Sequence, residues 1–203
     1  MKIICTQENL KHGLQTVGRI ISGTNTLPVL NNILFKTENG SLVLTTTNLE
    51  LAMKTSVRCK VEKEGAVTIP AKTIIDLISN LPNQNITLSL EGTEIIVSTE
   101  DYTTKLHTLP AEDFPLIPTV ESLWSATLSA PEFKQSLEQV IFATALSESQ
   151  PVLSGVSFTA KDKEVIFAAT DRYRLAEKKL VTKNTTGSRD AVIPHRTAVE
   201  ISR

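Results

Sequence analysis

Apolar side chains in the first third of the chain recur at two different spacings. Residues 9–21 are predicted to form a helix, because their apolar positions lie three or four residues apart and share one face. These positions are Leu10, Leu14, Val17 and Ile21. Alternation of apolar and polar residues predicts strands around this helix, at 2–6, 32–37, 42–46 and 51–61. Asn39-Gly40 predicts a hairpin turn between the second and third of these strands.

The same order of elements is predicted again from residue 66 and once more from residue 126. The first repetition has a strand at 66–69, a helix at 71–81, and strands at 86–90, 94–98 and 103–109, with Glu91-Gly92 as a turn. The second has a strand at 126–128, a helix at 131–146, and strands at 156–160, 164–168, 174–181 and 191–193. Asp162-Lys163 predicts a turn here, and residues 183–189 form a polar loop.

Short motifs repeat along with the spacing. Three of them return in the same order: Pro28-Val29-Leu30 as Pro151-Val152-Leu153, Thr47-Asn48 as Thr170-Asp171, and Ile69-Pro70 as Ile193-Pro194. The distance between copies is far longer than the roughly 20–50 residues of a solenoid repeat. The sequence therefore predicts a duplicated domain, with a linker near 115–125.

The second copy lacks a counterpart of residues 81–118. Its last residues, from Thr197 to Arg203, are predicted to begin a helix, and no stop signal follows. We therefore expect this chain to be the front of a longer protein. The alternative is a natural end with a degenerate second domain.

Composition and charge narrow the classes of function. A hydrophobic content of 40% suits packed cores, and a net charge of −1 gives no global attraction to nucleic acid. Cys5 and Cys59 are expected to be small core residues in a reduced compartment. His12, His107 and His195 lie on three different elements, without a catalytic or metal-binding spacing. We expect no catalytic residues, no metal, no cofactor and no membrane span.

Each predicted helix has one apolar face, so each must lie on a sheet. The predicted fold is α+β, with paired helices on curved antiparallel sheets in a duplicated domain whose second copy is truncated. Domains of this kind can close into a ring with the sheets outside and the helices lining the hole.

Five segments of the sequence resemble the bacterial DNA sliding clamp family, the beta subunit of DNA polymerase III. They are residues 26–30, 47–50, 69–72, 108–115 and 169–176. The family has three domains per chain, and two chains form a ring around duplex DNA. The resemblance implies domain I at 1–118, an incomplete domain II at 125–203 and no domain III. It also implies a non-catalytic function, which is to tether the replicative polymerase to DNA and raise its processivity.

The resemblance further implies phosphate contacts from the helices that face the hole. The implied residues are Lys11, Arg19, Lys72, Lys134 and Arg196, with Thr24 and Gln150 in the loops. Thr24 stands where the family often has an arginine, so we expect weak, salt-sensitive binding without sequence preference. The alternative for these helices is an ordinary solvated face.

A pocket for an apolar, aromatic linear peptide is implied in the second copy. Its residues are Val152, Leu153, Thr170, Arg172, Tyr173, Arg174 and Leu175. Leu153 and Leu175 would form an apolar floor, and the Thr170 hydroxyl and Arg174 would hold polar groups of the peptide. Arg172-Tyr173 replaces the Gly-His common in the family. The alternative for the two leucines is plain core packing.

The implied contact between chains lies at one end of the first copy. Its residues are Lys72, Ile75, Thr104 and Leu106, near a strand that would otherwise be an ordinary sheet edge. The implied partners are duplex DNA, a second copy of the full-length chain, the catalytic subunit of DNA polymerase III, the clamp loader and other proteins with a clamp-binding motif. The implied location is the cytoplasm.

Two other functions stay open from the sequence. One is a truncated clamp-like protein that binds peptides but does not encircle DNA. The other is an enzyme on a clamp-like scaffold, which would need clustered titratable groups in a pocket.

Overall fold

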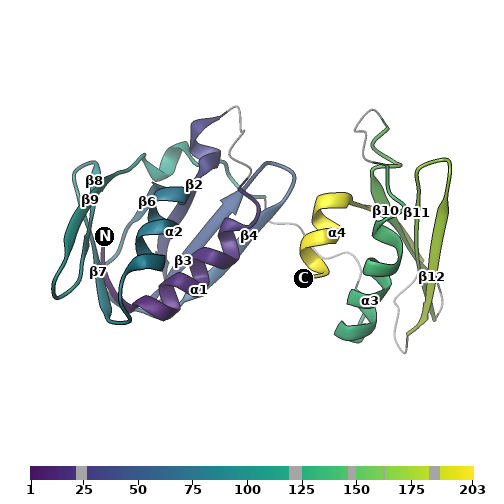
Figure 1. Cartoon of the computed structure of the whole chain (residues 1–203), viewed down its shortest axis with the longest axis horizontal. Helices are drawn as coiled ribbons and strands as arrows, with labels where there is room; N and C mark the ends of the chain where they lie inside the picture. The colour runs from purple at the N-terminus through teal and green to yellow at the C-terminus, as the bar shows by residue number, and fades with distance from the viewer. Residues whose placement is uncertain (22–26, 119–124, 146–149, 162, 183–187) are drawn as a thin grey trace. The chain divides into compact units, whose positions relative to one another are not determined.

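A computed structural model describes the chain except for residues 22–26, 119–124, 146–149, 162 and 183–187 (Figure 1). The chain forms two compact units, residues 1–118 and 119–203. The predicted residue Thr24, the turn residue Asp162 and most of the polar loop at 183–189 lie outside the described residues. No helix in the described parts of the chain is long and apolar enough to cross a membrane.

The first unit opens with β1 (Lys2–Thr6), which leads directly into α1 (Gln7–Gly18). Thr6 caps this helix, since its hydroxyl accepts a hydrogen bond from the Asn9 amide at 3.4 Å. The buried face of α1 carries Leu10, Leu14 and Val17. The helical spacing was therefore a correct guide to the element, although α1 begins and ends earlier than the predicted 9–21.

Two antiparallel sheets and two short 3₁₀ helices, Pro28–Asn31 and Ala111–Asp113, complete the first unit. The four-stranded sheet has the order β4-β3-β2-β6, from β2 (Asn32–Glu38), β3 (Ser41–Thr47), β4 (Ala52–Val57) and β6 (Ala66–Pro70). The five-stranded sheet has the order β5-β1-β7-β8-β9, with β5 (Lys60–Lys63), β7 (Asn85–Glu91), β8 (Glu94–Ser98) and β9 (Thr103–His107). Asn39 and Gly40 have φ values of 50° and 73°, which forms the predicted hairpin turn.

The two helices of the first unit lie side by side (Figure 1). Helix α1 packs on β3 and β4, and α2 (Ala71–Asn80) packs beside β6 of the same sheet. Their contact is close, because a Cβ atom at Gly18 would lie 2.7 Å from Ile75 Cδ1. The predicted helix pair on one side of a sheet is confirmed.

The core of the first unit joins both helices to both sheets. Leu10, Phe35 and Ile69 are fully buried in it. Cys5 is also buried and Cys59 packs against the same core. Burial, and to a lesser extent the neighbouring Cys59, raises the pKa of the Cys5 thiol to about 12, so this thiol stays protonated at neutral pH.

The prediction of one continuous strand at 51–61 is wrong. The chain leaves the four-stranded sheet after Val57 and joins the other sheet as β5, where Val61 lies opposite Ile3. Alternating burial continues through this change of sheet, with Val57, Cys59 and Val61 all turned inward. A period-two pattern cannot reveal a strand that changes sheets at a corner.

The second unit repeats the first half of this plan. Its elements are α3 (Ala130–Ile141), β10 (Gly155–Lys161), β11 (Glu164–Thr170), β12 (Leu175–Val181), β13 (Arg189–Pro194) and α4 (His195–Ile201). The sheet order is β12-β11-β10-β13, and α3 lies beside α4. Even the register is repeated, because Phe158 lies opposite Phe167 and Ala191 as Phe35 lies opposite Leu44 and Val67.

The strand predicted at 126–128 is not formed. Only Ala126 makes a single bridge, and residues 127–129 have no regular structure. The matching strand β1 is held between β5 and β7. The described part of the second unit offers no such pair of neighbouring strands, so the segment does not become a regular strand, although the Thr182 hydroxyl donates to the Thr127 carbonyl at 3.1 Å.

Candidate functional sites

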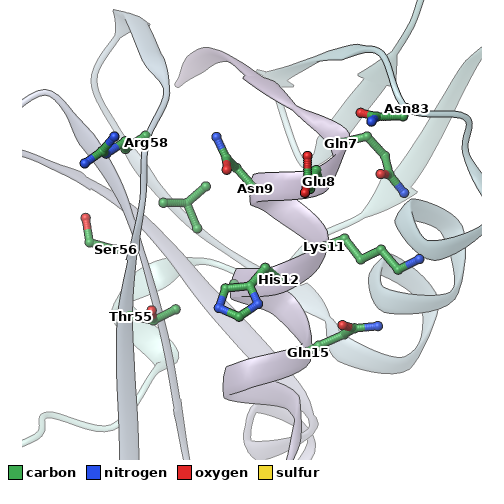
Figure 2. Close-up of a pocket in the computed structure, with 12 residues that line it drawn as sticks. Gln7, Glu8, Asn9, Lys11, His12, Gln15, Thr55, Ser56, Arg58 and Asn83 are labelled. Atoms are coloured by element: carbon green, nitrogen blue, oxygen red, sulfur yellow. The ribbon is translucent and has the colours of Figure 1, made fainter.

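The exposed face of α1 forms one wall of a polar groove of about 640 Å³ (Figure 2). The other wall contains Thr55 and Ser56 of β4 and the following Arg58. His12 points from α1 toward Thr55, whereas Lys11 points to the opposite side of the helix (Figure 2). Arg58 was not singled out from the sequence, because a basic residue after a strand carries no periodic signal.

Unpaired cations lie on the helix pairs of both units. Among the described residues, no carboxylate forms an ion pair with Lys11, Arg19, Lys72 or Arg196. Lys134 differs, because its Nζ lies 3.8 Å from Glu138 Oε1 and donates a hydrogen bond to the Arg203 carbonyl at 3.3 Å. Four of the five basic residues predicted to contact DNA are therefore free to meet an external phosphate.

These cations are grouped by unit. Lys11, Arg19 and Lys72 lie on the α1–α2 pair, and Lys134 and Arg196 lie on the α3–α4 pair. Gln150 is exposed just before Pro151. Each unit thus presents its own helix pair with at least one unpaired basic side chain.

The turn between β11 and β12 is held by its own side chains. The Thr170 hydroxyl donates to the Arg174 carbonyl at 2.7 Å and accepts from the Arg172 amide at 3.2 Å. Asp171 Oδ1 accepts from the Tyr173 and Arg174 amides at 3.1 and 3.0 Å. Arg172 has a φ of 78°, a conformation that side chains other than glycine rarely adopt.

An ion pair completes this turn. Arg174 Nε donates to Asp171 Oδ2 at 3.0 Å, and the Arg174 guanidinium lies 5.6 Å from the centre of the Phe142 ring. Desolvation alone would raise the pKa of Asp171, but the two amides and the guanidinium outweigh it and hold this pKa below its usual value. Thr170 and Arg174, predicted to hold a peptide, are thus already engaged within the turn.

Four large apolar side chains are exposed on three segments, which are this turn, the end of α3 and the stretch around Leu153. Tyr173 is 96% exposed, Val152 73%, Leu175 72% and Phe142 58%. The segment that carries Val152 is tied to the end of α3, since the Ala145 amide donates to the Leu153 carbonyl at 2.9 Å. Exposure of Leu175 argues against the core-packing alternative for this residue, whereas Leu153 is partly buried. We call Phe142, Val152, Tyr173 and Leu175 the apolar surface of the second unit.

Phe142 was missed from the sequence. It is the C-cap residue of α3 and extends the run Val140-Ile141, which is wider than one buried helix face. That excess of apolar residues was the available signal for a surface position.

The residues predicted for a chain-to-chain contact lie on two elements. Thr104 and Leu106 belong to β9, which is an edge strand of its sheet. Lys72 and Ile75 belong to α2, where Lys72 is exposed and Ile75 packs against α1. Leu106 is partly buried against the core.

The two units match two parts of one protein family. Residues 1–118 match the family described as DNA polymerase III beta subunit, N-terminal domain, and residues 127–203 match its central domain. The chain belongs to the DNA polymerase III beta subunit family.

Individual relatives agree over nearly the whole chain. The beta sliding clamp of Synechocystis sp. is 34% identical over 202 residues, which cover 95% of this chain and 52% of that protein. The beta sliding clamp of Escherichia coli is 32% identical over 205 residues, covering 100% of this chain and 56% of that protein. The chain thus spans about half the length of these curated relatives.

Solved structures give the same result. The DNA polymerase III subunit beta from Pseudomonas aeruginosa superimposes with a TM-score of 0.94 at 27% identity. A DNA polymerase III beta subunit from Eubacterium rectale superimposes with a TM-score of 0.95 at 25% identity. Each comparison covers 100% of this chain and 56% of the other. The paired helices on antiparallel sheets are therefore the fold of sliding clamps.

Proposed function

We propose that this protein acts as a DNA sliding clamp, which encircles duplex DNA as a ring and tethers the replicative DNA polymerase. The observation that carries the proposal is the repeated pair of adjacent helices with unpaired cations, in a chain of this family. Residues 1–118 would be domain I of the clamp and residues 125–203 part of domain II. The clamp would have no chemistry of its own.

Few, unpaired cations suit a ring that slides. Each phosphate that a Lys or Arg neutralises makes binding tighter and more dependent on salt. A ring is held on DNA by its topology, so strong contacts are unnecessary and would slow its movement. Lys11, Arg19, Lys72 and Arg196 would supply a small number of phosphate contacts that do not depend on base sequence.

The apolar surface of the second unit supports the predicted peptide site. We propose that a linear apolar segment of the polymerase, the clamp loader or another partner docks there, beside Leu153 and the Thr170–Leu175 turn. A few buried apolar anchors supply most of the affinity at such sites. The ring would contain two copies of the full-length chain in the cytoplasm, with β9 at the contact.

A different function would use the same peptide site without a ring. Retention on circular DNA separates the two functions, measured by gel filtration of the full gene product loaded onto a nicked plasmid by its clamp loader. A clamp stays on the circle and is lost once the circle is cut. A peptide-binding protein that does not encircle DNA gives the same low retention before and after cutting.

A further inference from the structure

The turn between β11 and β12 has a twin in the first unit that binds its backbone in the same way. There the Thr47 hydroxyl donates to the Leu51 carbonyl at 3.1 Å and accepts from the Leu49 amide at 3.0 Å. Asn48 Oδ1 accepts from the Glu50 and Leu51 amides at 3.1 and 2.8 Å. Leu49 has a φ of 76°, matching the 78° of Arg172. The backbone of both turns is therefore fixed, and the two differ in the side chains they display.

Among the residues that the structure describes, only one charge of the second turn is left without a partner. Asp171 and Arg174 neutralise each other through their 3.0 Å contact, and Arg174 also lies against the Phe142 ring. Arg172 is exposed, and no described residue forms an ion pair or hydrogen bond with its side chain. The turn therefore presents a single free positive charge.

This charge stands next to the apolar surface of the second unit. Arg172 immediately precedes Tyr173, which is 96% exposed, and Leu175 follows in the same turn at 72%. The twin turn has an apolar side chain, Leu49, in place of Arg172 and an acidic one, Glu50, in place of Tyr173. A free cation beside exposed apolar side chains thus distinguishes the second turn from its copy.

The backbone at Arg172 matches that at its twin Leu49, so the two turns differ in the side chain at this position and not in the chain path. A positive φ is unfavourable for any residue with a Cβ atom and is normally filled by glycine. Here the turn keeps a long cationic side chain at the strained position and displays it to solvent.

We propose that Arg172 selects partner peptides in which an acidic side chain lies next to the apolar anchors. This inference rests on the peptide site of the proposed function. The anchors would cover Tyr173, Leu175, Val152 and Phe142, while an Asp or Glu of the peptide would face the Arg172 guanidinium. The pair would gain from its partly desolvated setting beside the docked apolar side chains.

Two matched fluorescent peptides test this proposal on the full gene product. Both have Leu and Phe anchors in an extended chain, and they differ only in an Asp or an Asn between these anchors. We expect the Asp peptide to bind roughly two- to fivefold more tightly at low salt, the range of a partly exposed ion pair. The preference should shrink as salt is added.

Variants assign the preference to one residue. Arg172→Gln should abolish the difference between the peptides, and Arg172→Lys should keep most of it. Leu49→Gln, at the twin position, is the matched control and should leave both affinities unchanged. Equal thermal unfolding of the variants would show that the exposed side chain was changed without loss of the fold.

The outcomes separate this inference from the proposed function. If both peptides bind equally and Arg172→Gln changes neither, the role of Arg172 is overturned while the peptide site stands. If neither peptide binds, the site itself is overturned and the inference falls with it.

Discussion

The two units share a helix pair and a four-stranded sheet, but in the described chain only the first unit adds a second sheet. Leu10, Phe35 and Ile69 of the first unit are fully buried. Their counterparts are only partly buried and line an apolar groove of about 450 Å³: Phe133, Phe158 and Ile193. Equivalent apolar residues thus reach different depths of burial, because burial depends on a covering layer that local pattern does not reveal.

A second contrast separates the ends of the matching helices. The C-cap residue is Arg19 in α1 and Phe142 in α3. The turns differ as well, with Leu49-Glu50 in the first unit and Arg172-Tyr173 in the second, so here the second unit carries both the cation and the aromatic ring. One architecture therefore presents a cation at the helix end in one unit and an aromatic ring in the other.

The largest expected difference concerns the two equivalent phenylalanines. Phe35→Ala should destabilise the first unit by about 3–5 kcal/mol, since it removes a fully buried ring from a packed core. Phe158→Ala should cost clearly less, because part of its ring already meets solvent in the groove. Urea unfolding of the full gene product, with hydrogen exchange to resolve the units, measures both. Equal losses would contradict the difference in burial.

The next difference concerns the contact between α1 and β4. A Cβ atom at Gly13 would lie 2.4 Å from Val57 Cγ2, so Gly13→Ala should cost about 1–3 kcal/mol through overpacking. Alanine is the better helix former by about 1 kcal/mol, so propensity alone predicts the opposite sign. The counterpart Ser136 only bonds back to the Glu132 carbonyl, and Ser136→Ala should be nearly neutral. A more stable Gly13→Ala protein would disprove the close packing.

The twin turns should differ less. Thr47→Val and Thr170→Val each remove a hydroxyl that holds two backbone groups. Thr47 is buried, so its loss should cost about 1–3 kcal/mol. Thr170 is half-buried, and water can replace part of its bonding, so the second cost should be smaller. Thermal unfolding of both variants shows which one loses more stability. A larger loss in Thr170→Val than in Thr47→Val would contradict the expectation that the more buried hydroxyl contributes more.

The smallest expected difference concerns two equivalent lysines. Lys11→Ala should weaken duplex binding by roughly two- to fivefold, a typical value for one exposed charge contact. Lys134→Ala should have less effect, because Lys134 must leave Glu138 and the Arg203 carbonyl to reach a phosphate. Fluorescence anisotropy at one fixed salt concentration gives both values. A stronger effect at Lys134 would show that its ion pair does not compete with DNA.

Most helices and strands were predictable from local spacing, and their boundaries shifted by only a few residues. The strand at 51–61 was not, because alternation continues while the chain changes sheets after Val57. The strand at 126–128 failed for another reason, since an extended segment needs backbone partners that its own sequence does not supply. Both errors concern contacts between distant segments.

For the candidate sites, the sequence indicated which residues take part but not how they interact. Motif repetition located the turn at Thr170–Leu175, and the resemblance to the sliding clamp family implied the basic residues of the helices. Neither showed that Asp171 and Arg174 form a pair, because this depends on the fold of the turn. Phe142 and Arg58 were missed, since each gains its surroundings from a different element.

The central claim is that both helix pairs face DNA in the same way, and matched charge reversals test it most directly. Lys72 and Arg196 are counterparts, so Lys72→Glu and Arg196→Glu should each weaken duplex binding of the full gene product and reduce its salt dependence. The slope of log affinity against log salt should become shallower by about 1 for each phosphate that the variant no longer neutralises. Lys54→Glu is the control, because Lys54 lies on β4 and is already paired with Glu38 of β2. Similar losses of affinity for both variants on two unrelated DNA sequences are the predicted result. An unchanged slope in either variant, or a preference for one DNA sequence, would contradict the claim.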